Sequence, residues 1–451
     1  MSDAADRWLA AHARTLDTLD PGAPYADLEP LRGVLRDVKI VGLGESTHGT
    51  REFFRLKHRV LEFLVRDMGC TVLAMEAGES AARAVDAYVC HGVGDPIRLI
   101  TRLGFWTWRT EEMLDIVEWM RAHNLGVPAD RRVRFVGIDP QLSADSVAAL
   151  GSYLGQVAPE RAADMAELEV LARARPGTGP DPEQRLLHRA RSVAGFLDDN
   201  RAKFAELTSP QAAAEAVEHA RILCRSADLV TRSLDPGSPQ DNVFAVRDRY
   251  MAEAVARLTD GSGDSGDKGG SGDSGDKGGS GDSGDKGGSG DSAGTAGPVA
   301  LWAHNGHIAK GTYGNGVPAL GSHLRARFGD GYYALGLLFG KGSFRARSAN
   351  RTQGPGVRHR IGTSLRCVEG RLAAAVPGNY YVDLRAADPS SDGARWLREP
   401  SAQRSFGAAV PRLTYRFHIA PLTPAEDYDG LAFVSRSTCS RPLPDLDPEQ
   451  P

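Results

Sequence analysis

The chain of 451 residues is 41% hydrophobic and 25% charged, a composition typical of a folded globular protein. Its formal net charge of −4 provides no electrostatic basis for binding nucleic acid or an anionic membrane surface. Five cysteines, odd in number and without a C-x-x-C motif, predict neither a disulfide framework nor a thiolate metal site.

The amino-terminal segment is polar and lacks the apolar core of a signal peptide. No stretch of the chain reaches the roughly 18 consecutive apolar residues of a membrane-spanning helix. We therefore expect a cytoplasmic protein that has no membrane partner. Residues 6–35 predict two short helices separated by a break at Pro21-Gly22.

A strand, a loop and a helix are predicted over residues 37–68. The apolar, β-branched run over residues 38–43 is typical of a buried strand in a parallel sheet. An amphipathic helix follows, with its apolar stripe at Phe53, Leu56, Val60, Leu61, Leu64 and Met68. The loop between them carries Glu45 and His48 where ligands bind in open α/β sheets, which makes the two side chains a candidate acid–base pair. Alternatively, the loop only caps the helix and His48 is incidental.

Two further predicted strands end in a carboxylate. Residues 70–76 end in Glu76, and residues 133–138 are followed by Asp139. Because the carboxyl ends of parallel strands meet at one edge of a sheet, we expect both carboxylates near Glu45 and His48. Alternatively, Glu76 caps the next helix or pairs with an arginine, and Asp139 begins a helix rather than orienting a base.

Two long segments, residues 80–124 and 143–259, are predicted to be mainly helical. The first contains three tryptophans that are expected to pack against helices or in the core, Trp106, Trp108 and Trp119. The second belongs to a helical insertion over residues 141–260 that we expect to cover one end of the sheet as a wall or lid. By periodicity alone, its last helix presents a solvated face from Arg247 to Glu253.

Residues 261–297 change composition abruptly to Gly, Ser, Asp and Lys and contain three tandem copies of GDSGDKGGS. With no apolar residue to bury, this segment is predicted to be a disordered linker. The nine-residue period suggests a calcium-binding repeat, but the aspartate and apolar positions of that repeat are not matched.

Structure is predicted to resume with a strand over residues 299–303, which runs into His304 and His307. Later strands are expected over residues 332–338, 380–384, 415–419 and 431–434. The resulting fold class is α/β, with a mainly parallel sheet flanked by helices. Its core is divided between residues 1–140 and 298–435, and residues 436–451 are expected to form a flexible tail.

The predicted strand ends bring histidines and carboxylates to one edge, and no G-x-S-x-G motif or nearby cysteine offers a covalent nucleophile. One possible chemistry is water activation by a histidine that a carboxylate orients, with a second histidine stabilising the oxyanion. The other is a divalent metal held by two histidines and carboxylates. The residue spacing does not separate these two schemes.

Four motifs in this chain resemble the erythromycin esterase family: GLGESTHGTREFF in the first loop, AMEAG at residues 74–78, RDRYMAE at residues 247–253 and WAHNGH at residues 302–307. They occur in the order found in that family. The resemblance spans about residues 38–340.

The resemblance implies an α/β core with helical additions and hydrolysis of a macrolactone ester without a metal or other cofactor. It implies a general-base role for His48 beside Glu45 and Glu76, and it includes His304 and His307 in the catalytic set. Substrate binding is assigned to Lys57, Arg247 and Asp139. We expect a small-molecule partner, a macrolide or another cyclic or complex ester. The alternatives are a natural-product tailoring enzyme that cyclises or eliminates at the same site, and a metal-dependent hydrolase.

Overall fold

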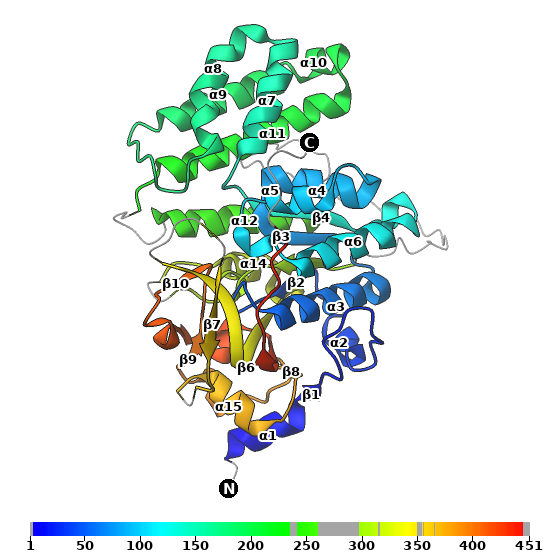
Figure 1. The fold of residues 1–451 in the computed structure, drawn as a ribbon, viewed down its shortest axis with the longest axis vertical. Coiled ribbons are helices and arrows are strands. Elements are labelled where there is room, and N and C mark those ends of the chain that lie inside the picture. The colour runs from blue at the N-terminus through cyan, green and yellow to red at the C-terminus, as the bar shows by residue number, and fades with distance from the viewer. Residues whose placement is uncertain are drawn as a thin grey trace, which may run out of the picture.

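A ten-stranded, mostly parallel sheet organises the fold of the computed structural model (Figure 1). The structure describes residues 3–234, 241–259, 297–313, 316–349, 354, 356–364 and 366–444. The segment expected to be a repeat linker, residues 261–297, lies outside the described residues except for Gly297.

The sheet order is β1-β8-β12-β6-β2-β5-β3-β4, and the six strands from β12 to β4 run parallel. The strands in this order are β1 (Arg14–Thr15), β8 (Tyr380–Asp383), β12 (Gly430–Ser437), β6 (Tyr332–Ser348), β2 (Ile40–Leu43), β5 (Val299–Trp302), β3 (Val72–Gly78) and β4 (Arg134–Asp139). Strands β8 and β1 add an antiparallel edge. Because β5 lies between β2 and β3, the loops after these three strands open side by side at one edge of the sheet.

Strand β6 extends beyond the main sheet and carries β7 (Val357–Ile361) and β10 (Ala409–Val410) on its second half. A separate antiparallel pair is formed by β9 (Ser401–Arg404) and β11 (Ile419–Leu422).

Helices cover both faces of the sheet, so successive strand residues are buried in two different layers. Val41 and Trp302 pack into the layer formed with α3 (Arg51–Met68), α4 (Glu79–His91) and α6 (Glu111–Leu125). Ile40 and Leu301 pack into the opposite layer. That layer includes α1 (Ala4–His12), α12 (Val243–Thr259), α14 (Leu320–Phe328) and α15 (Val368–Ala375). The alternation follows from the two-residue side-chain period of a strand and explains why both faces are apolar.

A helical bundle with its own apolar core lies beyond one end of the sheet, at the top of Figure 1. Its helices are α7 (Ala144–Val157), α8 (Ala162–Leu168), α9 (Arg185–Asp199), α10 (Arg201–Leu207) and α11 (Pro210–Thr231). Helix α12 instead packs its Met251 and Val255 against the sheet. The segment expected as one insertion over residues 141–260 therefore has two parts, a bundle and a helix of the core.

Short helices complete the described fold: α2 (Glu29–Val34), α5 (Pro96–Arg102), α13 (Asn305–Ile308), α16 (Pro424–Asp427) and the 3-10 turns η1 (Trp106–Trp108), η2 (Ala129–Arg131), η3 (Pro159–Arg161), η4 (Glu169–Ala172), η6 (Gly329–Gly331), η7 (Arg395–Arg398) and η8 (Tyr415–Phe417). None of the helices in the described ranges is long and apolar enough to cross a membrane.

Two expectations from the sequence are wrong here. The strand expected over residues 415–419 is the turn η8, and pairing begins only at β11 because the backbone folds back at Tyr415. The tail expected to be flexible from residue 436 is instead hydrogen-bonded to the core as far as Leu443, whose N–H donates to the carbonyl oxygen of Arg109. Thr438 accepts from the backbone N–H of Arg51, and Ser440 donates to the backbone of Gly49. Residues 445–451 lie outside the described residues.

Candidate active site

The loop after β2 is fixed by backbone hydrogen bonds to its neighbours. The amide of Asn305 donates to the carbonyl oxygen of Glu45 at 2.9 Å, and the amide of Ser46 donates to Leu337 at 3.1 Å. At Gly44, a Cβ atom would collide with the Asn305 side chain, so glycine permits this close approach. The loop is therefore rigidly placed beside the end of β5.

His48 lies against the carboxylate of Glu45 in a buried site. Its Nδ1–H donates to Oε1 of Glu45 at 2.7 Å, and Lys57 Nζ donates to Oε2 at 2.6 Å. Burial would raise the pKa of Glu45, but the charges of Lys57 and His48 lower it. The bonded Nδ1 leaves Nε2 of His48 without a hydrogen-bond partner among the described residues, and the residue as a whole is 9% exposed.

Lys57 acts on the Glu45–His48 pair through its charge, from a buried position. Its side chain is buried, and its ammonium lies 3.9 Å from the centroid of the Trp302 ring. Burial lowers the pKa of Lys57 to about 8, although Glu45 opposes the change. At neutral pH the ammonium therefore neutralises Glu45, and the carboxylate remains an acceptor for His48.

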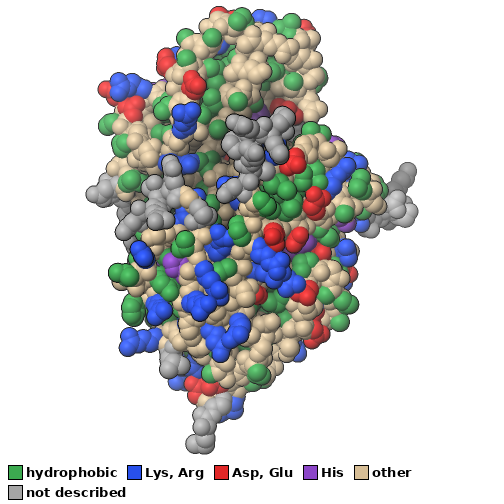
Figure 2. All heavy atoms as spheres, viewed as in Figure 1, with side chains coloured by type: hydrophobic (Ala, Val, Ile, Leu, Met, Phe, Trp, Pro, Cys, Tyr) green, Lys and Arg blue, Asp and Glu red, His purple; other side chains and the backbone are tan. Residues whose placement is uncertain are grey.

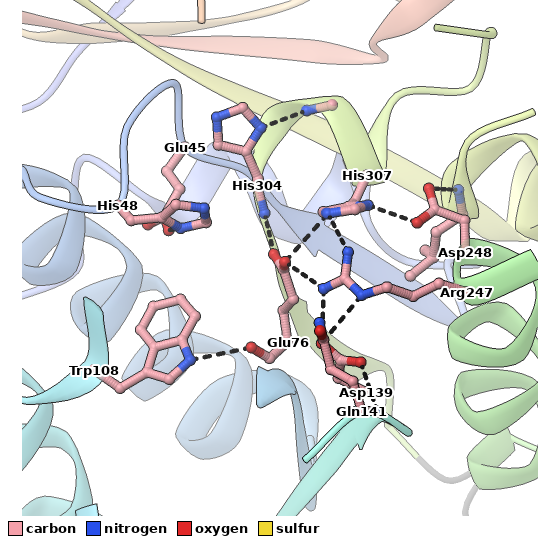
Figure 3. A network of polar contacts seen from close by, with 12 residues as sticks. Glu45, His48, Glu76, Trp108, Asp139, Gln141, Arg247, Asp248, His304 and His307 are labelled. Atoms are coloured by element: carbon pink, nitrogen blue, oxygen red, sulfur yellow. Dashed lines mark hydrogen bonds and ion pairs between the residues drawn. The ribbon is translucent and has the colours of Figure 1, made fainter. Parts of the chain in front are cut away.

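Two aromatic rings enclose His48. Trp108 meets it edge-on at 5.6 Å between ring centroids, and its indole N–H donates to the backbone oxygen of Glu76 at 3.1 Å. His304 lies on another side, 5.0 Å from His48 between centroids. Figure 3 shows these side chains converging from separate elements.

His304 is held as a neutral ring. Its Nδ1 accepts from the amide of Gly306 at 3.1 Å, which places the remaining hydrogen on Nε2. Burial, together with repulsion from His48 and His307, lowers the pKa of His304 to about 3. In the described part of the chain, the buried Nε2 has no hydrogen-bond partner. A buried donor left in this way is a candidate for contact with a substrate oxygen.

Glu76 is the centre of a second cluster of charged side chains (Figure 3). Its Oε1 contacts Arg247 at 2.9 Å and Nε2 of His307 at 3.1 Å, and its Oε2 accepts from the amide of His304 at 2.9 Å. Strand β3 shifts register between Met75 and Gly78, so Glu76 lies at an irregularity that can re-aim its side chain. Burial would raise the pKa of Glu76, but His307, Arg247 and His48 lower it well below its usual range.

His307 is held between two carboxylates. Its Nδ1 lies 2.8 Å from Oδ1 of Asp248, and its Nε2 faces Glu76. Burial would lower the pKa of His307, but Asp248 and Glu76 raise it to about 10. That pKa makes the ring a cation at neutral pH, and besides the two carboxylates its Nε2 also lies 3.1 Å from Nη1 of Arg247. Tyr313 completes the site by donating to Oδ2 of Asp248 at 2.8 Å.

Arg247 links this cluster to β4. Its guanidinium donates to Oδ2 of Asp139 at 2.7 Å and to Glu76. The side-chain amide of Gln141 also donates to Oδ2 of Asp139, at 2.7 Å. Arg247 and Asp248 are both buried because α12 packs on the sheet. The solvated face expected on this helix from periodicity is therefore wrong for these two residues, although Arg249 and Glu253 are exposed.

Comparison with known proteins identifies the family. The sequence model of the erythromycin esterase family matches residues 65–268 and 290–437. The chain belongs to the erythromycin esterase family. Membership supports an esterase-like hydrolase with a small-molecule substrate.

Individual relatives match to different extents. An Escherichia coli protein named erythromycin esterase type II is 33% identical over 119 residues, which is 26% of this chain and 27% of that protein. YbfO of Bacillus subtilis (strain 168), whose name assigns it provisionally to the hydrolases, is 24% identical over 96% of this chain and 91% of its own length.

Solved structures share the fold along nearly the whole chain. A Bacillus cereus protein superposes with a TM-score of 0.76 at 22% identity, covering 98% of this chain and all of that one. A succinoglycan biosynthesis protein gives 0.73 at 20% identity and covers 97% of both chains. A mutant erythromycin esterase in its open conformation gives 0.68 at 16% identity, with 96% of this chain and all of that chain covered.

All eight site residues predicted from the sequence lie in this region, in two groups joined by the hydrogen bond from the His304 amide to Glu76. Glu45, His48 and Lys57 form one group, beside His304. The other group contains the remaining predicted residues, Glu76, Asp139, Arg247 and His307.

Sequence reasoning missed three residues of the site. Asp248 and Tyr313 fix His307, and Trp108 encloses His48. Asp248 adjoins Arg247 in a family motif, which was the available signal for it. Trp108 and Tyr313 had none, since their partners are distant in sequence or set by packing.

A metal site was the open alternative for these residues. Within the described ranges, no group of three or more His, Cys, Asp or Glu side chains is arranged to hold a metal ion. The histidines and carboxylates of the site instead contact each other, as in the Glu45–His48 and Asp248–His307 pairs.

Proposed function

We propose that this protein hydrolyses a carboxylic ester within a lactone or macrolactone, with His48 as the general base. The observation that carries the proposal is the Glu45–His48 contact, which places the hydrogen on Nδ1 and leaves Nε2 as an acceptor. A histidine in this state can take a proton from water, and the carboxylate stabilises the imidazolium that forms.

The reaction follows from these positions. Nε2 of His48 takes a proton from water as the water oxygen attacks the ester carbonyl carbon. The carbonyl oxygen becomes an oxyanion, which accepts from the Nε2–H of His304. When the tetrahedral intermediate collapses, the C–O bond to the alcohol breaks and the imidazolium of His48 returns the proton to the leaving alkoxide. One water is consumed, and a carboxylic acid and an alcohol are formed.

Glu76 acts in this scheme as a positioning group. Its carboxylate holds the amide of His304 and is itself held by Arg247 and His307. Its low pKa keeps it charged. Lys57 would fix the carboxylate of Glu45 and Arg247 that of Glu76, while Asp139 holds Arg247. All three side chains are buried.

The test is a mass-spectrometric assay of the purified protein on macrolides of different ring size and on simpler lactones, with and without a chelator. We expect a product heavier by one water, formed at the same rate with the chelator. In His48→Ala the rate should fall by about 10²- to 10⁴-fold.

The matched control is His91→Ala, which removes an exposed histidine at the end of α4 and should leave the rate unchanged. A product of unchanged mass or one lighter by a water would instead indicate cyclisation or elimination. Loss of activity with the chelator would overturn the metal-independent scheme.

A further inference from the structure

Basic residues are concentrated in two segments of the chain that fold together. Residues 331–368 and 400–425 contain ten Lys and Arg residues and no Asp or Glu, although the chain as a whole carries a net charge of −4. The first segment supplies β6 and β7, and the second supplies β9, β10, η8 and β11. Figure 2 shows Lys and Arg side chains gathered where Figure 1 places β6 and β7. The net charge of the whole chain therefore conceals a basic lobe, which we define as these two segments.

Aromatic rings join the two segments of the basic lobe. Phe344 of β6 stacks on Phe406 at 4.4 Å between ring centroids, and His359 of β7 meets the ring of Tyr415 at 4.7 Å. The hydroxyl of Tyr415 also donates to the carbonyl oxygen of Arg360 at 2.8 Å. Tyr415 thus anchors the turn that contains η8 to the neighbouring strand.

The same turn presents the two most exposed large apolar side chains of the described residues. Leu413 is 86% exposed and Phe417 is 78% exposed, and Ile419 at the start of β11 is 54% exposed. Single exposed apolar residues are common on protein surfaces and need no explanation. Three of them within residues 413–419 form a patch, which indicates an interaction surface.

The backbone of this turn is fixed before any partner binds. The N–H of Tyr415 donates to the carbonyl oxygen of Pro411 at 3.1 Å, and that of Phe417 donates to Thr414 at 2.9 Å. Because the anchored backbone already displays Leu413 and Phe417, binding through them costs little further conformational entropy.

Cations alternate with the apolar side chains of the turn. Arg412 and Arg416 each directly precede one of the two most exposed apolar residues, and both arginines are exposed. Neither forms an ion pair with a described residue. Arg358 and Arg360 of the neighbouring β7 are exposed as well. Apolar side chains that project from a basic surface match an anionic bilayer, whose acyl chains accept the apolar groups and whose headgroups neutralise the cations.

We propose that the turn over residues 411–419 docks this protein on the surface of an anionic lipid bilayer. A protein partner is less well matched, because a stable protein interface buries roughly 800 Å² on each side and the apolar patch is a single turn.

The docking is peripheral and needs no membrane-spanning helix, of which there is none in the described ranges. The expectation of no membrane partner came from the net charge and from the lack of a spanning segment, and neither describes the basic lobe. The docking does not depend on the hydrolase function proposed for His48.

The first test is co-sedimentation of the full chain with two kinds of vesicle at low ionic strength. One kind contains equal parts of phosphatidylcholine and phosphatidylglycerol, and the other contains phosphatidylcholine alone. We expect at least tenfold tighter binding to the anionic vesicles, because each cation near an anionic leaflet strengthens binding about fivefold. Added salt should reduce this preference. Absence of binding to the anionic vesicles, or equal binding to both kinds, would overturn the proposal.

The second test removes the apolar part of the turn. In the double variant Leu413→Ser with Phe417→Ser we expect at least tenfold weaker binding to the anionic vesicles, from the loss of two buried apolar side chains. The matched control is Leu125→Ser, which changes a leucine that is 70% exposed at the end of α6. It should bind as the wild type does. All three side chains are exposed, so the variants should keep the fold, which circular dichroism checks. Equal binding of the double variant and the control would show that the turn does not enter the bilayer.

The third test removes the charges. Arg412→Gln with Arg416→Gln should weaken binding to the anionic vesicles by about five- to twentyfold. Arg185→Gln is the control, since Arg185 is an exposed arginine of α9 in the helical bundle. Equal binding of these variants would exclude the two arginines from the contact and overturn the proposal.

The remaining alternative is that the turn joins two copies of this chain. Sedimentation velocity of the wild type without lipid should show a monomer over the concentrations used with vesicles. A dimer that is lost in Leu413→Ser with Phe417→Ser would assign the patch to self-association and overturn membrane docking.

Discussion

The two histidine groups at the edge of the sheet differ in how completely their nitrogens are used. His48 and His304 each have one bonded nitrogen, and each keeps the other without a partner among the described residues. His307 is bonded at both nitrogens within the Arg247 cluster, which we define as Glu76, Asp139, Arg247, Asp248 and His307. The first group can exchange a proton or a hydrogen bond with a ligand, whereas the second can only hold its members in place.

This difference separates residues that one motif presents as equivalent. His304 and His307 are three positions apart, yet burial lowers the pKa of His304 to about 3 and two carboxylates raise that of His307 to about 10. At neutral pH, a neutral donor and a cation thus stand side by side. Histidine chemistry at this site depends on partners more than on residue type.

The largest expected effect is a loss of stability when Arg247 is removed from the Arg247 cluster. Arg247→Ala leaves Glu76 and Asp139 buried without their cation, so we expect the free energy of unfolding to fall by about 3–5 kcal/mol. Arg249→Ala on the same helix removes an exposed arginine and should change it by no more than about 1 kcal/mol. Urea unfolding of both variants measures the contrast. Equal losses would mean that the cluster does not stabilise the fold.

The next effect concerns catalysis rather than stability. His304→Ala removes the Nε2–H that we assign to the oxyanion, so kcat should fall by about 10²- to 10³-fold. The free energy of unfolding should fall by only about 1 kcal/mol, because the lost structural contact is the helix cap on Gly306. Steady-state kinetics and urea unfolding measure the two quantities. An unchanged kcat would remove His304 from the mechanism.

A third expected effect is a pH dependence of stability to which His307 contributes. Its folded-state pKa of about 10 exceeds the usual unfolded value of about 6.5, so its stabilisation is complete below pH 6.5 and is lost as pH rises through 10. The stability difference between the wild type and His307→Gln should therefore shrink with rising pH. The slope should approach about 1.4 kcal/mol per pH unit.

Urea unfolding at several pH values between 6 and 10.5 measures this trend. The corresponding difference between the wild type and His91→Gln serves as the control, since His91 is exposed. A constant difference for His307→Gln across the range would show that the ring is not held as a cation.

The sequence by itself determined the α/β class and the edge of the sheet at which the site would form. Glu45, Glu76 and Asp139 follow or end apolar strands, and parallel strands present their carboxyl ends at a common edge. Local periodicity was sufficient for these placements, because each depends on residues close together in the chain.

Only the tertiary structure decided which side chains are free to react. Arg247 meets Glu76 across 171 residues of sequence, and Asp139 across 108. The buried face of α12 depends on its packing against the sheet, which overrides the polar pattern of the helix. Hydrogen positions and charge states at His304 and His307 follow from such long-range partners and from burial. Neither can be read from the spacing of residues within a motif.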